Sequence, residues 1–450
     1  MIMKRSSFLF AALLALSIAA GCSKGGVKYD YPLFWTWANY RSGDNFDSLC
    51  TVINQVGIDG VVLNCDTPEE FEYVIPIAHA HGIKVFSSLC TLNPENEGAK
   101  LMKEHPEWLS VNRLGQSLAD TRAYVDHYRF LCPALPEVRE YLCDMVRAQC
   151  EIEGLDGISI DFHRFVDVIL PTTMWQKYNV VQDRELPEFD YGYHPEMIRL
   201  FKENYGYDPR EQEDPSMDEK WVQFRCDQIT GLANIFADIV HSYGKVMAAS
   251  PFPTPKIARR MVRQEWGKWN LDIVFPMVYY LYYTQDPSFC YDCMVENVRD
   301  KNPGSTLYCG IKYREDIVPA MDEAIRGGAQ GIAIFNINLI DTPEKVAEIR
   351  AYTDSVKAVA AANGGKLPAV KVPEAADTDF FAHEEVMSKI QERMKEITGA
   401  DELQLGEYDF VGKGDLDYNY EVSDALSGVS FVVTMYLCGD VFYGWNVTAK

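Results

Sequence analysis

The chain has 450 residues, of which 47% are hydrophobic and 24% charged, and its formal net charge at pH 7 is −24. Length and composition are typical of a globular protein that can hold one α/β barrel and a smaller domain. Because contacts to phosphates need a basic face, the acidity disfavours a nucleic-acid ligand, and it also disfavours an acidic polymer.

The first 22 residues have the features of a secretion signal. Two basic residues precede a short apolar run, residues 8–20, and the sequence AAGC ends at Cys22. These four residues resemble the lipobox of bacterial lipoproteins, so we expect residues 1–22 to be a lipoprotein signal and Cys22 to be the lipidated residue. Ser23 then favours the outer membrane of the cell envelope. An ordinary secretory signal cleaved near Gly21 is the alternative.

From about residue 31, strand-like and helix-like segments alternate. Residues 136–154 are a typical predicted helix, because the segment opens with a proline and closes on a glycine. Eight such strand–helix units with buried strands imply a parallel sheet closed into a (β/α)8 TIM barrel over residues 31–361. An open doubly wound sheet is the alternative, but no glycine-rich nucleotide fingerprint follows the early strands. The predicted strands are residues 32–38, 60–65, 84–90, 157–162, 245–250, 272–280, 306–311 and 331–337.

Two segments fall outside this alternation. Residues 164–218 are predicted to be a long polar and aromatic insertion after the fourth strand. Residues 362–379 have the composition of a linker. They are followed by a predicted helix at 381–398 and several strand-like runs, so residues 380–450 are expected to form a small α+β or β-rich domain of unknown role.

The fourth strand carries the strongest functional signal. In the segment GLDGISIDFHRF, residues 154–165, Ile158, Ile160 and Phe162 share one parity, and Ser159, Asp161 and His163 share the other. A carboxylate at the carboxyl end of a buried strand is costly unless it has a partner or a function. In a TIM barrel this end of the strands holds the catalytic groups, so Asp161 is the first catalytic candidate.

Polar and aromatic residues also follow other predicted strands. Aromatic faces pack on the apolar faces of sugar rings, and amides hydrogen-bond hydroxyls, so this combination around one carboxylate favours a carbohydrate site. The alternative for each aromatic residue alone is packing in the core. The predicted substrate-binding residues are Trp35, Trp37, Asn64, His163, Arg164, Tyr279, Tyr280 and Asn336, with Asn338, Tyr282 and Tyr283 just beyond.

Neither a cofactor nor a metal is predicted. No H-E-x-x-H or EF-hand spacing occurs. Cys290 and Cys293 form a C-x-x-C, but no second pair stands at zinc-finger spacing, so metal or redox use of this pair is disfavoured.

Six stretches together resemble the bacterial family-10-like glycosyl hydrolases, a group of TIM-barrel proteins distantly related to chitinase-type barrels. The resemblance covers about residues 32–350. It implies a glycosidase fold, and Asp161 and Arg164 match that family's residues. The stretches are HPEWL with a following Asn-Arg-x-Gly, LCPALPEVREYL, GLDGISIDFHRF, FKENYGYDP, WVQFRCDQI and QEWGKWNLDIVFPMVYY.

The departures from these relatives concern the second carboxylate. Chitinase-type barrels have Asp-x-Asp-x-Glu on this strand, whereas this chain has Ser159, Asp161 and His163, so the chitinase acid is absent. The family's Gln-Asp-Trp is Gln-Glu-Trp here. Glycoside hydrolysis usually needs two carboxylates, and the candidates for the second are Glu265 and Asp66.

The sequence therefore predicts a glycoside hydrolase that acts on a polysaccharide or oligosaccharide, with peptidoglycan glycan or an imported glycan as the substrate. The alternative is a glycan-binding envelope lipoprotein that kept the barrel without turnover. A weaker possibility is a structural envelope protein. The expected partners are a carbohydrate and, through Cys22, a membrane; the sequence does not predict the oligomeric state.

Overall fold

The computed structural model describes residues 31–94, 98–182, 184–372, 384–413, 417–438 and 441–450. The predicted signal segment and its lipidation residue, Cys22, lie outside these ranges, as does most of the second half of the predicted linker. Within the described ranges, no helix is both long enough and apolar enough to span a membrane.

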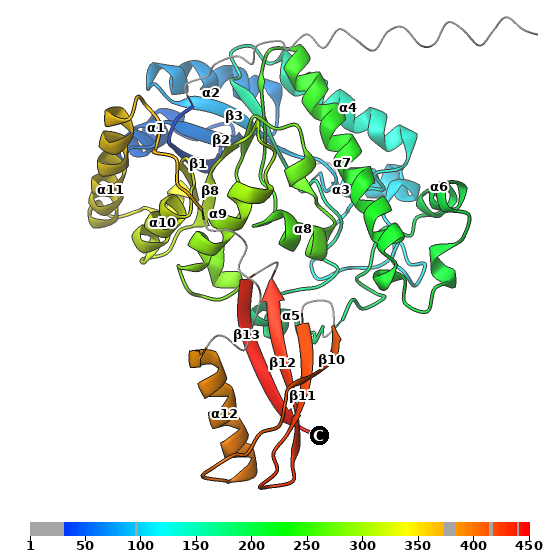
Figure 1. Cartoon of the computed structure of the whole chain (residues 1–450). Coiled ribbons are helices and arrows are strands. Elements are labelled where there is room, and N and C mark those ends of the chain that lie inside the picture. The colour runs from blue at the N-terminus through cyan, green and yellow to red at the C-terminus, as the bar shows by residue number, and fades with distance from the viewer. Residues whose placement is uncertain (1–30, 95–97, 183, 373–383, 414–416, 439–440) are drawn as a thin grey trace, which may run out of the picture. The chain divides into compact units, whose positions relative to one another are not determined.

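One sheet of parallel strands forms the centre of the larger part of the chain (Figure 1). Their hydrogen-bonded order is β7-β6-β5-β4-β3-β2-β1-β9-β8. The strands are β1 (Phe34–Asn39), β2 (Gly60–Asn64), β3 (Lys84–Cys90), β4 (Gly157–Asp161), β5 (Val246–Ala249), β6 (Ile273–Val274), β7 (Thr306–Leu307), β8 (Cys309–Lys312) and β9 (Ile332–Phe335).

The strands β7 and β8 are two halves of one segment, and this segment closes the barrel. β7 pairs with β6, and β8 pairs with β9. Between and beyond these pairings, Tyr308 N donates to Val274 O at 3.0 Å and Gly310 N donates to Pro276 O at 2.9 Å. Residues 306–312 therefore hydrogen-bond to the strands at both ends of the sheet. Because β7 and β8 count as one barrel strand, the nine assigned strands form the predicted eight-stranded barrel.

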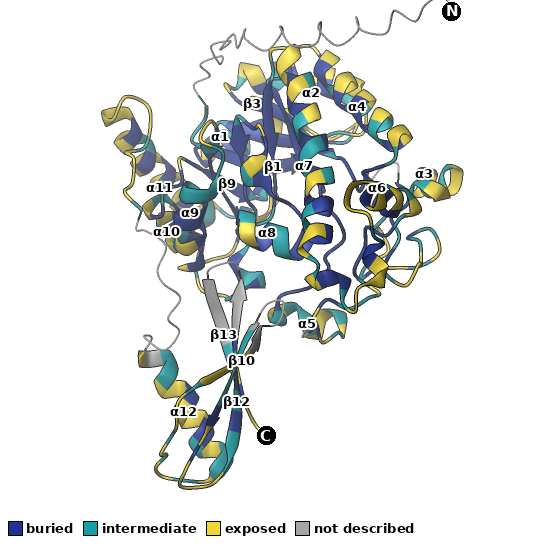
Figure 2. Cartoon of the chain, turned by 45° about the vertical axis from the view of Figure 1, so that its right-hand side comes forward, coloured by how far each residue is buried: buried dark blue, intermediate teal, exposed yellow. Residues whose placement is uncertain are grey.

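Helices surround the barrel and turn their apolar faces inward (Figure 2). The long helix α7 shows how the sequence achieves this, because Asp218 caps its first turn and Ile229, Leu232 and Phe236 are fully buried on one face. The helices are α1 (Phe46–Gln55), α2 (Pro68–Ala80), α3 (Gly98–Glu104), α4 (Pro136–Glu151), α5 (Thr172–Tyr178), α6 (Pro195–Tyr205), α7 (Glu219–Ser242), α8 (Pro255–Val262), α9 (Phe289–Asp300), α10 (Ile317–Arg326) and α11 (Pro343–Ala362).

The sixth strand is much shorter than the nine residues predicted for it. Regular pairing ends at Val274, since Pro276 has no N–H to donate to a neighbouring strand. The chain then enters a short 3-10 helix at Tyr280–Tyr282. As a result, Tyr279 and Tyr280 lie in a loop at the carboxyl end of the barrel and not in a strand.

The C-terminal part is α+β, in agreement with one of the two predicted classes. It contains α12 (Glu384–Thr398) and an antiparallel sheet of β10 (Asp409–Lys413), β11 (Asp417–Ser423), β12 (Ser430–Cys438) and β13 (Val441–Ala449). Ile390 and Met394 of the helix share a buried core with Phe431 and Val433 of the sheet. The domain limits at 31–361, 362–379 and 380–450 remain predictions.

Candidate functional site

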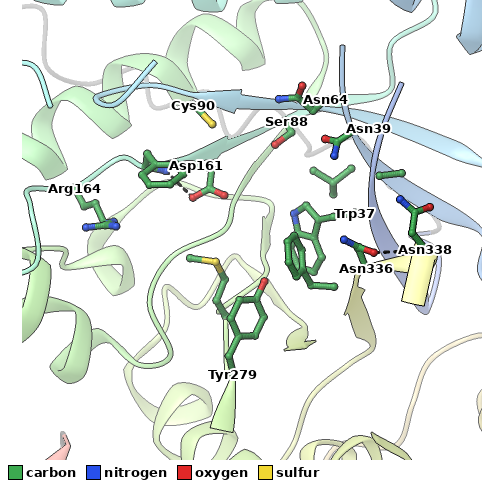
Figure 3. Close-up of a pocket in the computed structure, with 15 residues that line it drawn as sticks. Trp37, Asn39, Asn64, Ser88, Cys90, Asp161, Arg164, Tyr279, Asn336 and Asn338 are labelled. Atoms are coloured by element: carbon green, nitrogen blue, oxygen red, sulfur yellow. Dashed lines mark hydrogen bonds between the residues drawn. The ribbon is translucent and has the colours of Figure 1, made fainter. Parts of the chain in front are cut away.

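The carboxyl ends of the barrel strands surround a cavity of about 360 Å³, within the range of small-molecule sites. Its walls combine aromatic rings, four amides, an arginine and, among the residues that line it, a single carboxylate (Figure 3). The lining residues are Trp37, Ala38, Asn39, Val62, Asn64, Ser88, Cys90, Asp161, Phe162, Arg164, Met277, Tyr279, Phe335, Asn336 and Asn338.

Asp161 reaches this cavity because of the alternation along β4. Ile158 and Ile160 are buried in the core, while Ser159 Oγ lies 3.3 Å from Ser250 Oγ. Two residues after Ser159, Asp161 is the last residue of the strand, and its carboxylate lines the cavity. Its Oδ1 accepts a hydrogen bond from Phe162 N at 2.6 Å, which fixes one carboxylate oxygen.

Tyr279 lines the cavity from the loop after β6, and its hydroxyl points into the same space as the Asp161 carboxylate (Figure 3). Burial raises the pKa of Tyr279 well above its ordinary value, and the negative charge of Asp161 raises it further. The phenol is therefore neutral near pH 7 and available as a hydrogen-bond donor.

Trp37 is only 7% exposed, so one part of its ring faces the cavity while the rest is held in place. Its ring centroid lies 5.9 Å from that of Phe275 and 6.0 Å from that of Phe335, with edge-to-face geometry in both pairs. Phe335 also lies 5.7 Å from Tyr279. The aromatic side of the cavity is thus a packed surface that is already formed.

The amides line another part of the wall. Asn39 and Asn64 are partners in register at the ends of β1 and β2. Asn64 Oδ1 accepts a hydrogen bond from Arg41 Nη2 at 2.8 Å, and Asn336 Oδ1 accepts one from Asn338 N at 3.1 Å. Each of these two side chains keeps an amide NH₂ group that can donate to a ligand hydroxyl.

Arg164 lines the cavity but is strongly held by the protein. Its Nη1 donates to Asp167 Oδ2 at 3.0 Å, and its Nη2 donates to the Tyr128 hydroxyl at 3.2 Å. The guanidinium carbon also lies 5.0 Å from the centroid of Phe130 and 5.1 Å from that of Phe252. Although burial lowers the pKa of Arg164, Asp167 and Tyr128 more than offset this effect, so its pKa is raised and the group is charged.

Two aromatic residues predicted to bind substrate lie elsewhere. Trp35 is fully buried one layer below Trp37, where Gly60 leaves room for its ring. Tyr280 is also fully buried, and its hydroxyl donates to Asp316 Oδ1 at 2.8 Å. Both predictions are wrong, because Trp35 fills the barrel interior and Tyr280 is not among the residues that line the cavity.

The prediction for His163 is wrong for a different reason. β4 ends at Asp161, and Phe162 has a φ of +48°, so the alternation of the strand does not continue. His163 is 1% exposed, with Nδ1 3.0 Å from Thr91 Oγ1 and Nε2 2.9 Å from Ile229 O. Burial lowers the pKa of His163 to about 4. It is a neutral side chain in the barrel wall.

Neither candidate for a second carboxylate lines the cavity. Asp66 lies on an exposed turn after β2, with Oδ2 2.9 Å from Arg41 Nε. Glu265 lies between α7 and α8, where Oε2 is 2.7 Å from Lys268 Nζ and accepts a hydrogen bond from Gln223 Nε2 at 2.8 Å. The assignment of Glu265 and Asp66 as catalytic partners of Asp161 in this cavity is therefore corrected.

Sequence reasoning missed several lining residues, although strand register could have found some. Cys90 is the register partner of Asp161, and Ser88 is the partner of Ser159, so both share the inward parity of β4. Asn39 is the partner of Asn64. Met277 and Phe335 gave no comparable signal. Over the part of the chain that is described, no group of three His, Cys, Asp or Glu side chains could hold a metal ion.

No protein-family model matches this chain, and no curated protein matches it. Among solved structures, the chain is similar to an exo-β-N-acetylglucosaminidase of family GH20 from Vibrio harveyi, solved with N-acetylglucosamine (12% identity, TM-score 0.38, 72% of this chain and 54% of that one). The chain thus spans about half the length of that structure.

Two further structures are similar at the same level. One is the glycoside hydrolase domain of PelA from Pseudomonas aeruginosa (10% identity, TM-score 0.37, 68% of this chain and 97% of that one). The other is a β-N-acetylhexosaminidase (11% identity, TM-score 0.41, 77% and 80%). The fold assignment rests on the strand pairings, and the activity is inferred from the cavity.

Proposed function

We propose that this protein is a glycoside hydrolase that acts on a polysaccharide or oligosaccharide at the carboxyl end of its barrel. The observation that carries the proposal is the carboxylate of Asp161 in a cavity whose other walls are aromatic rings and amides. Aromatic rings pack on the apolar faces of sugars, and an amide can both donate a hydrogen bond to a hydroxyl and accept one from it. This chemistry suits a neutral carbohydrate.

The lining residues divide into distinct roles. Asp161 acts as the acid/base or the nucleophile at the glycosidic bond. The neutral Tyr279 phenol donates a hydrogen bond to a substrate oxygen near that carboxylate. Trp37 and Phe335 pack against the sugar ring, while Asn64 and Asn336 orient its hydroxyls. Arg164 positions Phe162, whose ring centroid lies 5.2 Å from its guanidinium carbon, while Asp167 and Tyr128 accept hydrogen bonds from it.

A second candidate function is glycan binding without turnover. The specific observation in its favour is that Asp161 is the only carboxylate among the residues lining the cavity, whereas hydrolysis usually uses a pair. In a binding protein, Asp161 would accept hydrogen bonds from sugar hydroxyls, and the same aromatic and amide contacts would fix the ring.

The two functions are separated by measuring turnover and binding on the same samples. Purified protein is incubated with a glycan panel that includes peptidoglycan, chitin, cellulose and starch oligosaccharides, and new reducing ends are counted. Binding is followed by calorimetry with the parent and with Asp161→Asn. Asp66→Asn is the matched control, because Asp66 also follows a strand but lies outside the cavity.

The hydrolase is supported if the parent and Asp66→Asn both turn over a glycan, and Asp161→Asn still binds that glycan but no longer cleaves it. Binding without turnover by the parent supports the second candidate. Turnover that survives in Asp161→Asn removes this cavity from the reaction.

We further propose that the protein is anchored to the bacterial envelope through Cys22, with the outer membrane favoured by Ser23. The support is the lipobox-like AAGC sequence at residues 19–22. Metabolic labelling with a tagged fatty acid tests this, with Cys22→Ala as the control. Labelling of both forms, or of neither, contradicts the anchor and leaves the proposed hydrolase unaffected.

A further inference from the structure

We propose that the glycan continues from the Asp161 cavity onto a second, shallower subsite that holds a further sugar unit of the same chain. This inference rests on the proposed function, since it names an extended oligosaccharide as the ligand of that site. It assigns to the insertion after β4 a role in recognising chain length.

The second subsite is a depression of about 100 Å³ on the same face of the barrel. Its residues come from the loops that follow β3, β4, β5 and β6, so they gather at the carboxyl ends of these strands. Its characteristic side chains are Tyr124, Tyr128, Asp167, Tyr178, Phe252 and Tyr282. The depression is too small to enclose a sugar, so a ring would lie on the aromatic surface with its other face in water.

The depression and the cavity share a wall. Arg164 lines the cavity, and the two side chains that accept hydrogen bonds from it, Asp167 and Tyr128, line the depression. At another point along the boundary, Tyr279 of the cavity lies 6.2 Å from Tyr282 of the depression, measured between ring centroids. A glycan that leaves the cavity over this wall therefore meets the aromatic depression next.

The aromatic surface is already ordered for a ligand. Tyr124 stacks on Phe189 with centroids 4.2 Å apart, and its hydroxyl accepts a hydrogen bond from Gln182 Nε2 at 2.8 Å. Tyr178 meets the Tyr124 ring edge-on at 5.5 Å. Because packing and hydrogen bonds fix these rings before binding, little side-chain freedom would be lost when a sugar settles on them.

The charge of the depression fits a neutral sugar. Its acidic group, Asp167, is 6% exposed and is paired with Arg164 at 3.0 Å, so the wall carries no net charge from these two residues. Asp167 Oδ2 also accepts a hydrogen bond from the Tyr128 hydroxyl at 3.1 Å. What remains for a ligand is mainly ring surface, on which an uncharged pyranose can pack.

The test is a length series with Tyr178→Ala. Tyr178 is partly exposed at the end of α5, so its removal leaves the core intact. Oligomers of β-1,4-linked N-acetylglucosamine, β-1,4-linked glucose and α-1,4-linked glucose, from one to six units, are titrated by calorimetry. Tyr178→Phe retains the ring. Tyr243→Ala is the matched control, because this 43% exposed tyrosine follows α7 and precedes β5, at the opposite end of the barrel.

We expect the parent to bind longer oligomers more tightly than short ones, and Tyr178→Ala to lose roughly three- to tenfold in affinity for the long ones only. Tyr178→Phe and Tyr243→Ala should resemble the parent. Three results would overturn the second subsite and leave the hydrolase proposal standing. They are an equal loss of affinity in Tyr178→Ala at every oligomer length, no loss at any length, or a parent whose affinity does not depend on length. A parent that binds no glycan at all would overturn both.

Discussion

Carboxylates are withdrawn from bulk water in two regions of the barrel domain, and their surroundings differ. In the insertion after β4, Asp190 and Glu185 are buried and contacted by arginines: Arg225 for Asp190, and Arg263 for Glu185. At the barrel mouth, Asp161 borders a cavity among aromatic rings and amides. The first arrangement neutralises charge inside the protein, whereas the second leaves the carboxylate accessible to a ligand.

The comparison shows that burial alone does not identify a functional carboxylate. Glu265 is 8% exposed and stands in a stretch that resembles a glycosidase motif, yet Lys268 and Arg259 hold it between two helices. Access to a cavity is the feature that separates Asp161 from Glu265 and from Asp190. Substitutions in the two regions should therefore separate activity from stability.

The largest expected effect is on turnover by Asp161→Asn. Loss of the acid/base or nucleophile should lower kcat on any glycan that the parent cleaves by at least about 10³-fold. The free energy of unfolding should change by less than about 1 kcal/mol, because the amide retains most of the side chain's volume at a partly exposed position. Urea unfolding and initial rates measure the two quantities. A large loss of stability would place Asp161 with the structural carboxylates.

The opposite result is expected for Arg225→Met. Asp190 would remain fully buried, with Arg113 Nε 3.3 Å from its Oδ2 and Arg263 as a further cation nearby. We expect a loss of about 3 kcal/mol in unfolding free energy, because removing one partner leaves a buried charge poorly compensated. Activity per folded molecule should be unchanged.

The matched control for this variant is Arg326→Met, which removes an exposed pair with Glu323. It should cost less than about 1 kcal/mol. Equal effects of the two arginine substitutions would show that the Arg225–Asp190 pair contributes no more than a surface ion pair.

His163, which is buried outside the cavity, should make stability depend on pH. Its ordinary pKa of 6.5 falls to about 4 in the folded protein because it is buried. Below pH 6.5, His163 is therefore protonated in the unfolded chain but stays neutral in the folded protein. The stability that this residue contributes above pH 6.5 is lost as the pH falls toward 4. Between pH 7 and pH 5 the loss should be about 2 kcal/mol.

Urea unfolding of the parent and of His163→Gln at the two pH values measures this contribution. The variant should be less stable at pH 7 but should lose about 2 kcal/mol less on acidification. An identical pH dependence in both proteins would mean that another group is responsible and that His163 is not held neutral.

The sequence predicted those features that depend on local pattern. The alternation of strands and helices gave the barrel, and the parity of Ile158 and Ile160 against Ser159 gave the inward direction of Asp161. The same rule failed at His163, because the left-handed backbone of Phe162 lies between them. The prediction for Tyr280 failed for another reason: both neighbouring tyrosines were assigned to the site, but only Tyr279 lines the cavity.

Other features depend on contacts between distant segments. The Arg164–Asp167–Tyr128 group joins the insertion to the loop after β3, and no spacing along the chain encodes this contact. Likewise, Trp35 and Trp37 share a parity, so the sequence pattern does not distinguish them. Trp35 is a core residue and Trp37 lines the cavity because they lie at different depths in the barrel.

Glu265→Gln should leave turnover unchanged and reduce stability only slightly. The amide can keep one contact to Gln223 but loses the ion pairs with Lys268 at 2.7 Å and Arg259 at 3.4 Å, so the unfolding free energy should fall by about 1 kcal/mol. Turnover per folded molecule should equal that of the parent, since no contact places Glu265 in the cavity. A loss of turnover beyond tenfold in a fully folded variant would return Glu265 to the reaction, and the single carboxylate of the cavity would then be an incomplete description of the active site.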